Sequence, residues 1–250
     1  YTKSCDSKGI YVYEFDSKTA DFKFKNSSEN IINPSYLSVS NDNKFVYSVS
    51  ENDNKSSISA FGYNSKSGKL DFINHQNPNG LNPCYVINDD KNVITANYSS
   101  GNISVLGKNI DGSIGEAKQL VQHTGKSINT NRQEAAHAHM VYFSPDKKYV
   151  LANDLGTDKV YVYQYNPNSQ TEVLKLKSSV NCTPGSGPRH LIFSNDGKYV
   201  YVLQELDGVI SSFSYTDGVL EKRSETSIVS ADFKEDFGAA DIHISPDGKF

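Results

Sequence analysis

Apolar and polar residues alternate along most of the chain in short runs that are separated by polar turns. In residues 36–50, for example, YLSVS is followed by the turn NDNK and by the apolar run FVYSVS. These runs lack the 3.6-residue spacing of an amphipathic helix. They have the two-residue period, or the short continuous apolar stretch, that is typical of β-strands. The pattern therefore predicts an all-β protein.

The same strand-turn-strand unit occurs five times. Each copy has an aspartate at the centre of its turn, and the copies follow one another about every 50 residues. The turn aspartates are Asp42, Asp90, Asp146, Asp196 and Asp247. A repeat of this length that is made of strands predicts a β-propeller, in which each blade is a four-stranded antiparallel sheet.

Four strands are expected within one copy. In the first copy the candidates are residues 37–40, 44–51, 57–64 and 70–74. Residues 10–32 have the pattern of the two outer strands of an earlier blade, and the fifth copy, residues 239–250, reaches only its second strand. We therefore expect residues 1–250 to form a single propeller domain of about five to six blades. An open ring leaves an unpaired strand edge, so we expect a chain truncated at its C-terminus.

Composition narrows the range of partners. The formal net charge of −4 and the pI near 5.9 disfavour an electrostatic nucleic-acid surface. No apolar run approaches the roughly 18 residues that a membrane span needs. The three cysteines, Cys5, Cys84 and Cys182, are too far apart to predict a disulfide framework or a zinc knuckle. We expect a cytoplasmic monomer or weak oligomer, although the chain starts at Tyr1 and a removed signal peptide stays an open alternative.

Three residues are candidates for catalysis. His139 and Arg189 occupy matching places, each seven residues before its turn aspartate, at the start of a strand that should line the central channel. Glu205 ends the next strand and should return to the same rim, close to Arg189. Arginine is rare in this chain, which has only Arg132, Arg189 and Arg223. A structural salt bridge is the alternative interpretation of the Arg189–Glu205 pair.

Other polar residues near this rim are candidates for substrate binding. His137 shares a strand face with His139, but no third ligand at a suitable spacing is evident, so we expect no metal and no other cofactor. An arginine in the polar loop before the histidines can hold a phosphate or a carboxylate, or can lie on the solvated surface. The substrate-binding candidates are Arg132, His137, His190, Asn97, Asp154 and His243.

Three motifs in order carry a family resemblance. RQEAAHAHMVYFSPDKKYVLAND, GSGPRHLIFSNDGKYVYVLQEL and AADIHISPDGK resemble the lactonase-type seven-bladed propellers, the propeller class of 6-phosphogluconolactonase, and the similarity extends over essentially the whole chain. It implies metal-independent hydrolysis of 6-phosphoglucono-1,5-lactone to 6-phosphogluconate, a step of the pentose phosphate pathway. A cyclase that acts on carboxy-cis,cis-muconate and a non-enzymatic scaffold are the alternatives, because a fold alone does not fix a function.

The resemblance also implies roles for individual residues. It places His139, Arg189 and Glu205 at active-site positions of the family, and it implies a further arginine from a later blade that residues 1–250 do not include. Opening a lactone needs a base for the attacking water, a cation near the developing oxyanion and donors for the phosphate. His139 or Glu205 can be the base. Arg189 can hold the oxyanion or the phosphate with its planar fork.

Overall fold

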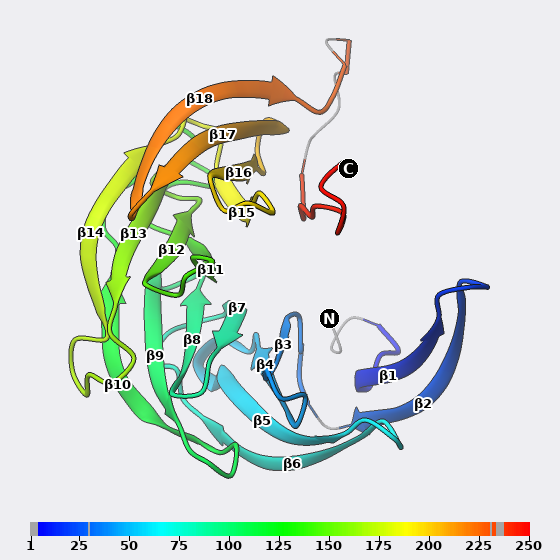
Figure 1. Cartoon of the computed structure of the whole chain (residues 1–250). Coiled ribbons are helices and arrows are strands. Elements are labelled where there is room, and N and C mark those ends of the chain that lie inside the picture. Colours follow the sequence, from blue (N-terminus) through cyan, green and yellow to red (C-terminus); the bar gives the residue numbers. More distant parts are fainter. Residues whose placement is uncertain (1–4, 30, 231, 234–237) are drawn as a thin grey trace. The chain divides into compact units, whose positions relative to one another are not determined.

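Strands form nearly all of the regular structure, as the alternating pattern predicts (Figure 1). The computed structural model describes residues 5–29, 31–230, 232–233 and 238–250. In these residues, 18 strands are joined by turns and loops that include one short 3₁₀ helix, η1 (Asp53–Lys55). The aromatic and β-branched residues that fill the strands favour this pleated, half-buried geometry.

The strands form one hairpin and four four-stranded sheets, and in each sheet neighbouring strands follow one another in the sequence. The hairpin is β1 (Gly9–Asp16) and β2 (Asp21–Glu29). The sheets are β3 (Leu37–Val39), β4 (Phe45–Ser50), β5 (Ser57–Asn64) and β6 (Lys69–Gln76); β7 (Pro83–Asn88), β8 (Asn92–Asn97), β9 (Asn102–Lys108) and β10 (Ile114–Gln122); β11 (Ala138–Phe143), β12 (Tyr149–Asp154), β13 (Lys159–Tyr165) and β14 (Leu174–Asn181); and β15 (Pro188–Phe193), β16 (Tyr199–Gln204), β17 (Val209–Thr216) and β18 (Val219–Ser227).

The predicted sheets are confirmed. All four strands expected in the first copy are present as β3 to β6, and residues 10–32 contain the expected strand pair, β1 and β2. The fifth copy is different, because the described residues 238–250 contain its turn but no strand. A strand requires a hydrogen-bonded neighbour. In this segment the backbone–backbone bonds are those of the turn, Ser245 N–H to Phe250 O and Gly248 N–H to Ser245 O, and a single bond from the Ala239 N–H to the Glu205 carbonyl, which is too little for a strand pair.

The turn aspartates act as hydrogen-bond acceptors. Asp146 Oδ1, for example, accepts from the Ser144 hydroxyl at 2.7 Å and from the Lys148 N–H at 3.1 Å, and the same pair of bonds recurs at Asp42, Asp196 and Asp247. These bonds fix the turn locally. The prediction for the second turn was wrong, because Asp89 and not Asp90 accepts the N–H groups of Lys91 and Asn92. This turn is shorter than the others, which shifts the acceptor by one residue.

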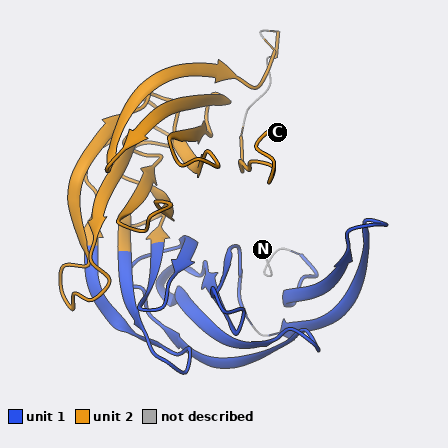
Figure 2. Ribbon diagram, in the orientation of Figure 1, with its two compact units in different colours: residues 1–95, 104–120 blue, residues 96–103, 121–250 orange. Residues whose placement is uncertain are grey.

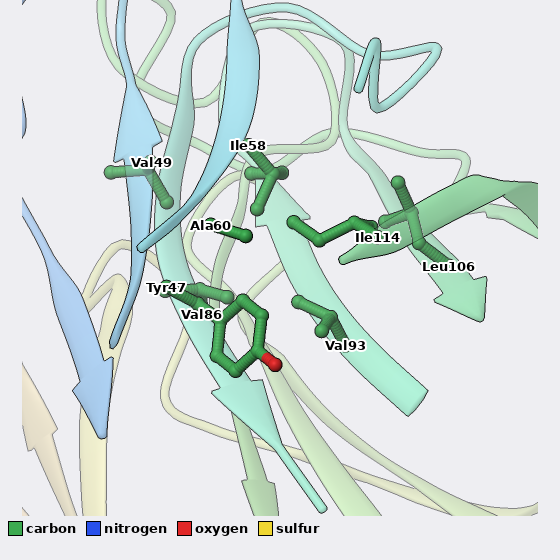
Figure 3. Packing of buried hydrophobic residues seen from close by; sticks show 8 residues of the cluster. All are labelled: Tyr47, Val49, Ile58, Ala60, Val86, Val93, Leu106 and Ile114. Atoms are coloured by element: carbon green, nitrogen blue, oxygen red, sulfur yellow. The ribbon is translucent and has the colours of Figure 1, made fainter. Parts of the chain in front are cut away.

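The chain divides into two compact units, one of residues 1–95 and 104–120 and one of residues 96–103 and 121–250 (Figure 2). Unit 1 contains a core in which eight residues are almost completely buried (Figure 3). They are Tyr47, Val49, Ile58, Ala60, Val86, Val93, Leu106 and Ile114. The Tyr47 hydroxyl donates to the Gly112 carbonyl at 3.0 Å. The bond satisfies the one polar atom in this core, as burial of a tyrosine requires.

Unit 2 contains the two sheets β11–β14 and β15–β18. They pack against each other, with β15 next to β11 and β12, and β18 next to β14. Their shared core consists of aliphatic residues on alternating strand positions, including Val141, Leu151, Leu191 and Val202, each at most 1% exposed. Tight packing of this kind gives β11 and β15 fixed relative positions. The starts of these two strands carry the candidate site.

Candidate functional site

A β-bulge lies at the start of both β11 and β15. In the first pair Ala138 is opposite Asp154 and Met140 is opposite Asn153, so that His139 is the extra residue. In the second pair the register shifts between Pro188 and His190, so that Arg189 is the extra residue. Bulges bend a strand and redirect a side chain, and they often lie next to active sites. The two residues that the repeat pairs in sequence therefore share the same backbone irregularity.

Glu205 links these two residues to Arg132. It follows directly after β16, and its Oε2 forms a salt bridge with Arg189 Nε at 3.0 Å. Its Oε1 accepts from Arg132 Nη2, and His139 Nε2 lies 3.8 Å from Oε2. The Glu205 side chain is only 12% exposed, so these charge-assisted contacts are weakly screened by water. All three predicted catalytic residues thus lie in one cluster with Arg132.

The charges of this cluster follow from its surroundings. Burial, and then the charge of Arg189, the neighbouring His190 and the charge of Arg132, hold the pKa of His139 well below its usual value. The imidazole is therefore neutral at pH 7. Hydrogen bonds to Tyr98 and Glu205 outweigh burial and raise the pKa of Arg132. Two guanidinium groups against one carboxylate leave the cluster with a net positive charge.

Tyr98 is a site residue that the sequence analysis did not select. Its ring stacks on His137, with centroids 4.6 Å apart, and meets His139 edge-on at 5.4 Å. The Tyr98 carbonyl accepts from His137 Nδ1 at 3.0 Å, and its hydroxyl oxygen accepts from Arg132 Nη2 at 3.4 Å. Tyr98 comes immediately after β8 ends at Asn97. The sequence feature that could have identified Tyr98 is an aromatic residue at the end of a strand, on the predicted rim.

Asn97 and Asp154, which were predicted to bind substrate, are completely buried. Asn97 Nδ2 donates to Asn102 Oδ1 at 2.8 Å. The Asp154 carboxylate accepts from the N–H of His137 at 2.9 Å and from His123 Nδ1 at 2.7 Å. Neither side chain has exposed surface with which to contact a ligand in this arrangement. Asp154 instead holds the backbone of His137, and Asn97 pairs with Asn102.

His190 lies beside the cluster, whereas His243 lies at its edge. The His190 ring meets the His139 ring edge-on, with centroids 5.5 Å apart. Asp241 connects the two predicted residues, since its Oδ1 accepts from His190 Nδ1 at 2.7 Å and its Oδ2 accepts from His243 Nε2 at 2.9 Å. His243 is 78% exposed. Burial lowers the pKa of His190, and the hydrogen bond to Asp241 offsets only part of this effect.

Two further features concern the part of the chain that the structure describes. Within it, no three His, Cys, Asp or Glu side chains are grouped so that they could hold a metal ion. The same residues include no helix of the length and hydropathy that a membrane span requires.

Successive four-stranded antiparallel sheets, each with its strands in chain order, define a β-propeller protein. The chain belongs to the family described as "Lactonase, 7-bladed beta-propeller", which it matches over residues 1–250. It is 36% identical to a 6-phosphogluconolactonase of Bacillus subtilis, in an alignment that covers the whole of this chain and 71% of that protein.

Two solved structures are also similar. One is a crystal structure from Bacteroides fragilis, of a protein assigned as a 6-phosphogluconolactonase, with a TM-score of 0.92 and 39% identity. It matches 98% of this chain and 70% of its own. The other is the periplasmic gluconolactonase of Pseudomonas aeruginosa, with a TM-score of 0.91 and 32% identity over 98% of this chain and 71% of its own.

Proposed function

We propose that the protein hydrolyses 6-phosphoglucono-1,5-lactone to 6-phosphogluconate without a metal ion. The observation that carries this proposal is the Glu205 carboxylate, which is held between Arg189 and Arg132 and lies next to the neutral imidazole of His139. Family membership and the names of the relatives from B. subtilis and B. fragilis support the same reaction.

The cluster can perform each step of ring opening. Neutral His139 can take the proton from water as the water oxygen bonds to the lactone carbonyl carbon. Arg189 uses Nε for Glu205, so its terminal NH₂ groups can donate to the carbonyl oxygen as negative charge develops there. When the ring C–O bond breaks, the leaving alkoxide takes the proton back from His139. Glu205 then serves to hold both arginines in place, although it is also near enough to be the alternative base.

The net positive charge favours an anionic substrate. The Arg132 side chain is 42% exposed even though it contacts Glu205, so part of its fork can reach a phosphate. A second candidate substrate is glucono-1,5-lactone, which lacks the phosphate. It is favoured by the name of the P. aeruginosa relative, a gluconolactonase.

The proposal is tested by measuring hydrolysis of both lactones by the purified protein, with the spontaneous rate subtracted. Glu205→Gln and Arg189→Lys should lower kcat/KM for the phosphorylated lactone about 100-fold or more, because aligned charged donors at an oxyanion supply this much. Arg223→Lys is the matched control for Arg189, since Arg223 is an exposed arginine on β18. A rate equal to the spontaneous one for both lactones would refute the proposed function. Turnover of a carboxylated muconolactone instead would favour the cyclase alternative.

A cytoplasmic location and a monomeric state belong to the same proposal. The spacing of the three cysteines predicts no disulfide framework, which is typical of proteins from a reducing compartment. Cell fractionation checks the location, and light scattering after size-exclusion chromatography checks the oligomeric state.

A further inference from the structure

The turn between β12 and β13, residues 154–158, contains two buried carboxylates. Asp154 is 0% exposed and Asp158 is 3% exposed. Aspartate is almost never this deeply buried unless its oxygens are paired or hydrogen-bonded. We call Arg132, His139, Arg189 and Glu205 the charged cluster. Neither aspartate forms a salt bridge with its arginines, so the two carboxylates are not part of this cluster.

Asp154 and its neighbour hold the segment that leads into His139. Asp154 Oδ1 accepts from the His137 N–H at 2.9 Å, and the Leu155 N–H donates to the His137 carbonyl at 2.9 Å. Both backbone polar groups of His137 are therefore bound to the turn. Gly156 lies so close to this segment that a Cβ on it would be 1.8 Å from the Ala135 carbonyl oxygen.

Asp158 holds the segment that leads into Arg189. Its Oδ2 accepts from the Gly185 N–H and its Oδ1 accepts from the Gly187 N–H, both at 2.7 Å. The Gly187 carbonyl in turn accepts from the Glu205 N–H at 2.8 Å. One carboxylate thus fixes the backbone two residues before Arg189 and, through Gly187, the backbone of Glu205.

Asp154 is itself fixed by two buried side chains. Its Oδ2 accepts from His123 Nδ1 at 2.7 Å, and His123 Nε2 is hydrogen-bonded to the Tyr163 hydroxyl at 2.7 Å. His123 and Tyr163 are both buried. A fully bonded network in a dry interior is rigid, because each member would lose a bond by moving.

We propose that the 154–158 turn positions the active site, with Asp154 setting the place of His137–His139 and Asp158 setting the places of Arg189 and Glu205. Two strand starts from different sheets must be aligned to a fraction of an ångström, and one turn is bonded to both. The consequence for catalysis rests on the proposed function, whereas the consequence for the geometry does not. Asp154 and Asp158 are thus positioning residues, which act on the reaction through the backbone that they bind.

The test uses Asp154→Asn and Asp158→Asn, with Asp146→Asn as the matched control. Asparagine keeps the size of the side chain and removes an anionic acceptor, and it tolerates the positive φ of 52° at residue 158. Asp146 also accepts a backbone N–H in a turn of the same sheet, but at the other end of β12. The readouts are kcat and KM for the lactone, and the titration of His139 by NMR, which is tractable because the chain has six histidines.

We expect Asp154→Asn and Asp158→Asn to lower kcat about 10- to 100-fold with a smaller change in KM, because displacement by about 1 Å is enough for such a loss. The titration of His139 should move toward that of a free histidine in both variants and stay unchanged in Asp146→Asn. Folded variants in which His139 titrates as in the wild type would overturn the proposal. If the wild type hydrolyses neither lactone, the proposed function fails, and the NMR titration still decides this inference.

A measurement on the unmodified protein covers the case in which a variant does not fold. The amide hydrogens of His137, Gly185 and Gly187 should exchange with solvent at least 100-fold more slowly than unprotected amides, because buried carboxylates hold them. Exchange at unprotected rates would contradict the proposal.

Discussion

Adding a single methyl group at Gly156 should move the site without touching any residue of the charged cluster. In Gly156→Ala the new Cβ would lie 1.8 Å from the Ala135 carbonyl oxygen and 2.8 Å from the His137 nitrogen, whereas ordinary contacts begin at 3.4 Å. The φ angle of Gly156 is outside the left-handed region, so the conflict is purely steric. Since both opposing atoms belong to the backbone, the segment that leads into His139 must move by about 1 Å or more.

The expected cost is about 1–3 kcal/mol of unfolding free energy, as for other overpacked sites, and about a 100-fold loss of kcat/KM. Thermal unfolding and lactone hydrolysis measure the two effects. The control is Gly62→Ala in β5, where the nearest atom to the added Cβ is the Asp71 carbonyl oxygen at 3.8 Å, so both quantities should stay close to the wild type. Wild-type activity in folded Gly156→Ala would refute the reasoning, because the segment would then have moved without consequence.

Three further predictions concern charge, stacking and metal. Because burial and neighbouring charges hold the pKa of His139 well below its usual value in the folded state, only the unfolded chain binds a proton at this residue below about pH 6.5. The unfolding free energy should therefore fall as the pH is lowered there, by up to about 1.4 kcal/mol per pH unit. Thermal unfolding from pH 8 to 5 should show a smaller slope in His139→Gln than in the wild type, and equal slopes would contradict the lowered pKa. Tyr98→Phe keeps the stack on His137 and loses the Arg132 bond, so lactone assays should show a loss below about 10-fold, with a larger loss in Tyr98→Ala. Dialysis against a chelator should leave the rate unchanged, and activity that returns only with a divalent ion would contradict a metal-free reaction.

The sequence was sufficient to predict the repeat and the residues that occupy matching places in it. His139 and Arg189 lie seven residues before their turn aspartates, and the structure brings both to Glu205. This part was predictable because strand and turn patterns are local. The bulges at His139 and Arg189 were not, since a register shift depends on the hydrogen bonds of two strands together.

Other misses have related causes. Asp154 was predicted to face substrate because a polar residue at a strand end looks the same in sequence whether it points to the channel or to the neighbouring backbone. Its partners, the His137 N–H and His123, are 17 and 31 residues away, and only the folded chain shows them. Asp90 was preferred to Asp89 for a similar reason, because the length of a turn is set by the strands on either side of it.

Comparison of two sheets shows that the charged cluster depends on the residues around Glu205 and not on the glutamate alone. Glu51 lies nine residues after its turn aspartate, as Glu205 does. In unit 1, however, the Glu51 carboxylate accepts a hydrogen bond from the Ser35 hydroxyl, whereas the Glu205 carboxylate forms a salt bridge with the Arg189 guanidinium. The glutamate at this place in the fold thus has a neutral hydroxyl as its partner in one sheet, and in the other a guanidinium, which the proposed function assigns to the developing oxyanion. Glu51→Gln should therefore leave lactone hydrolysis unchanged under conditions in which Glu205→Gln abolishes most of it, and equal losses in the two variants would show that the glutamate position serves folding rather than chemistry.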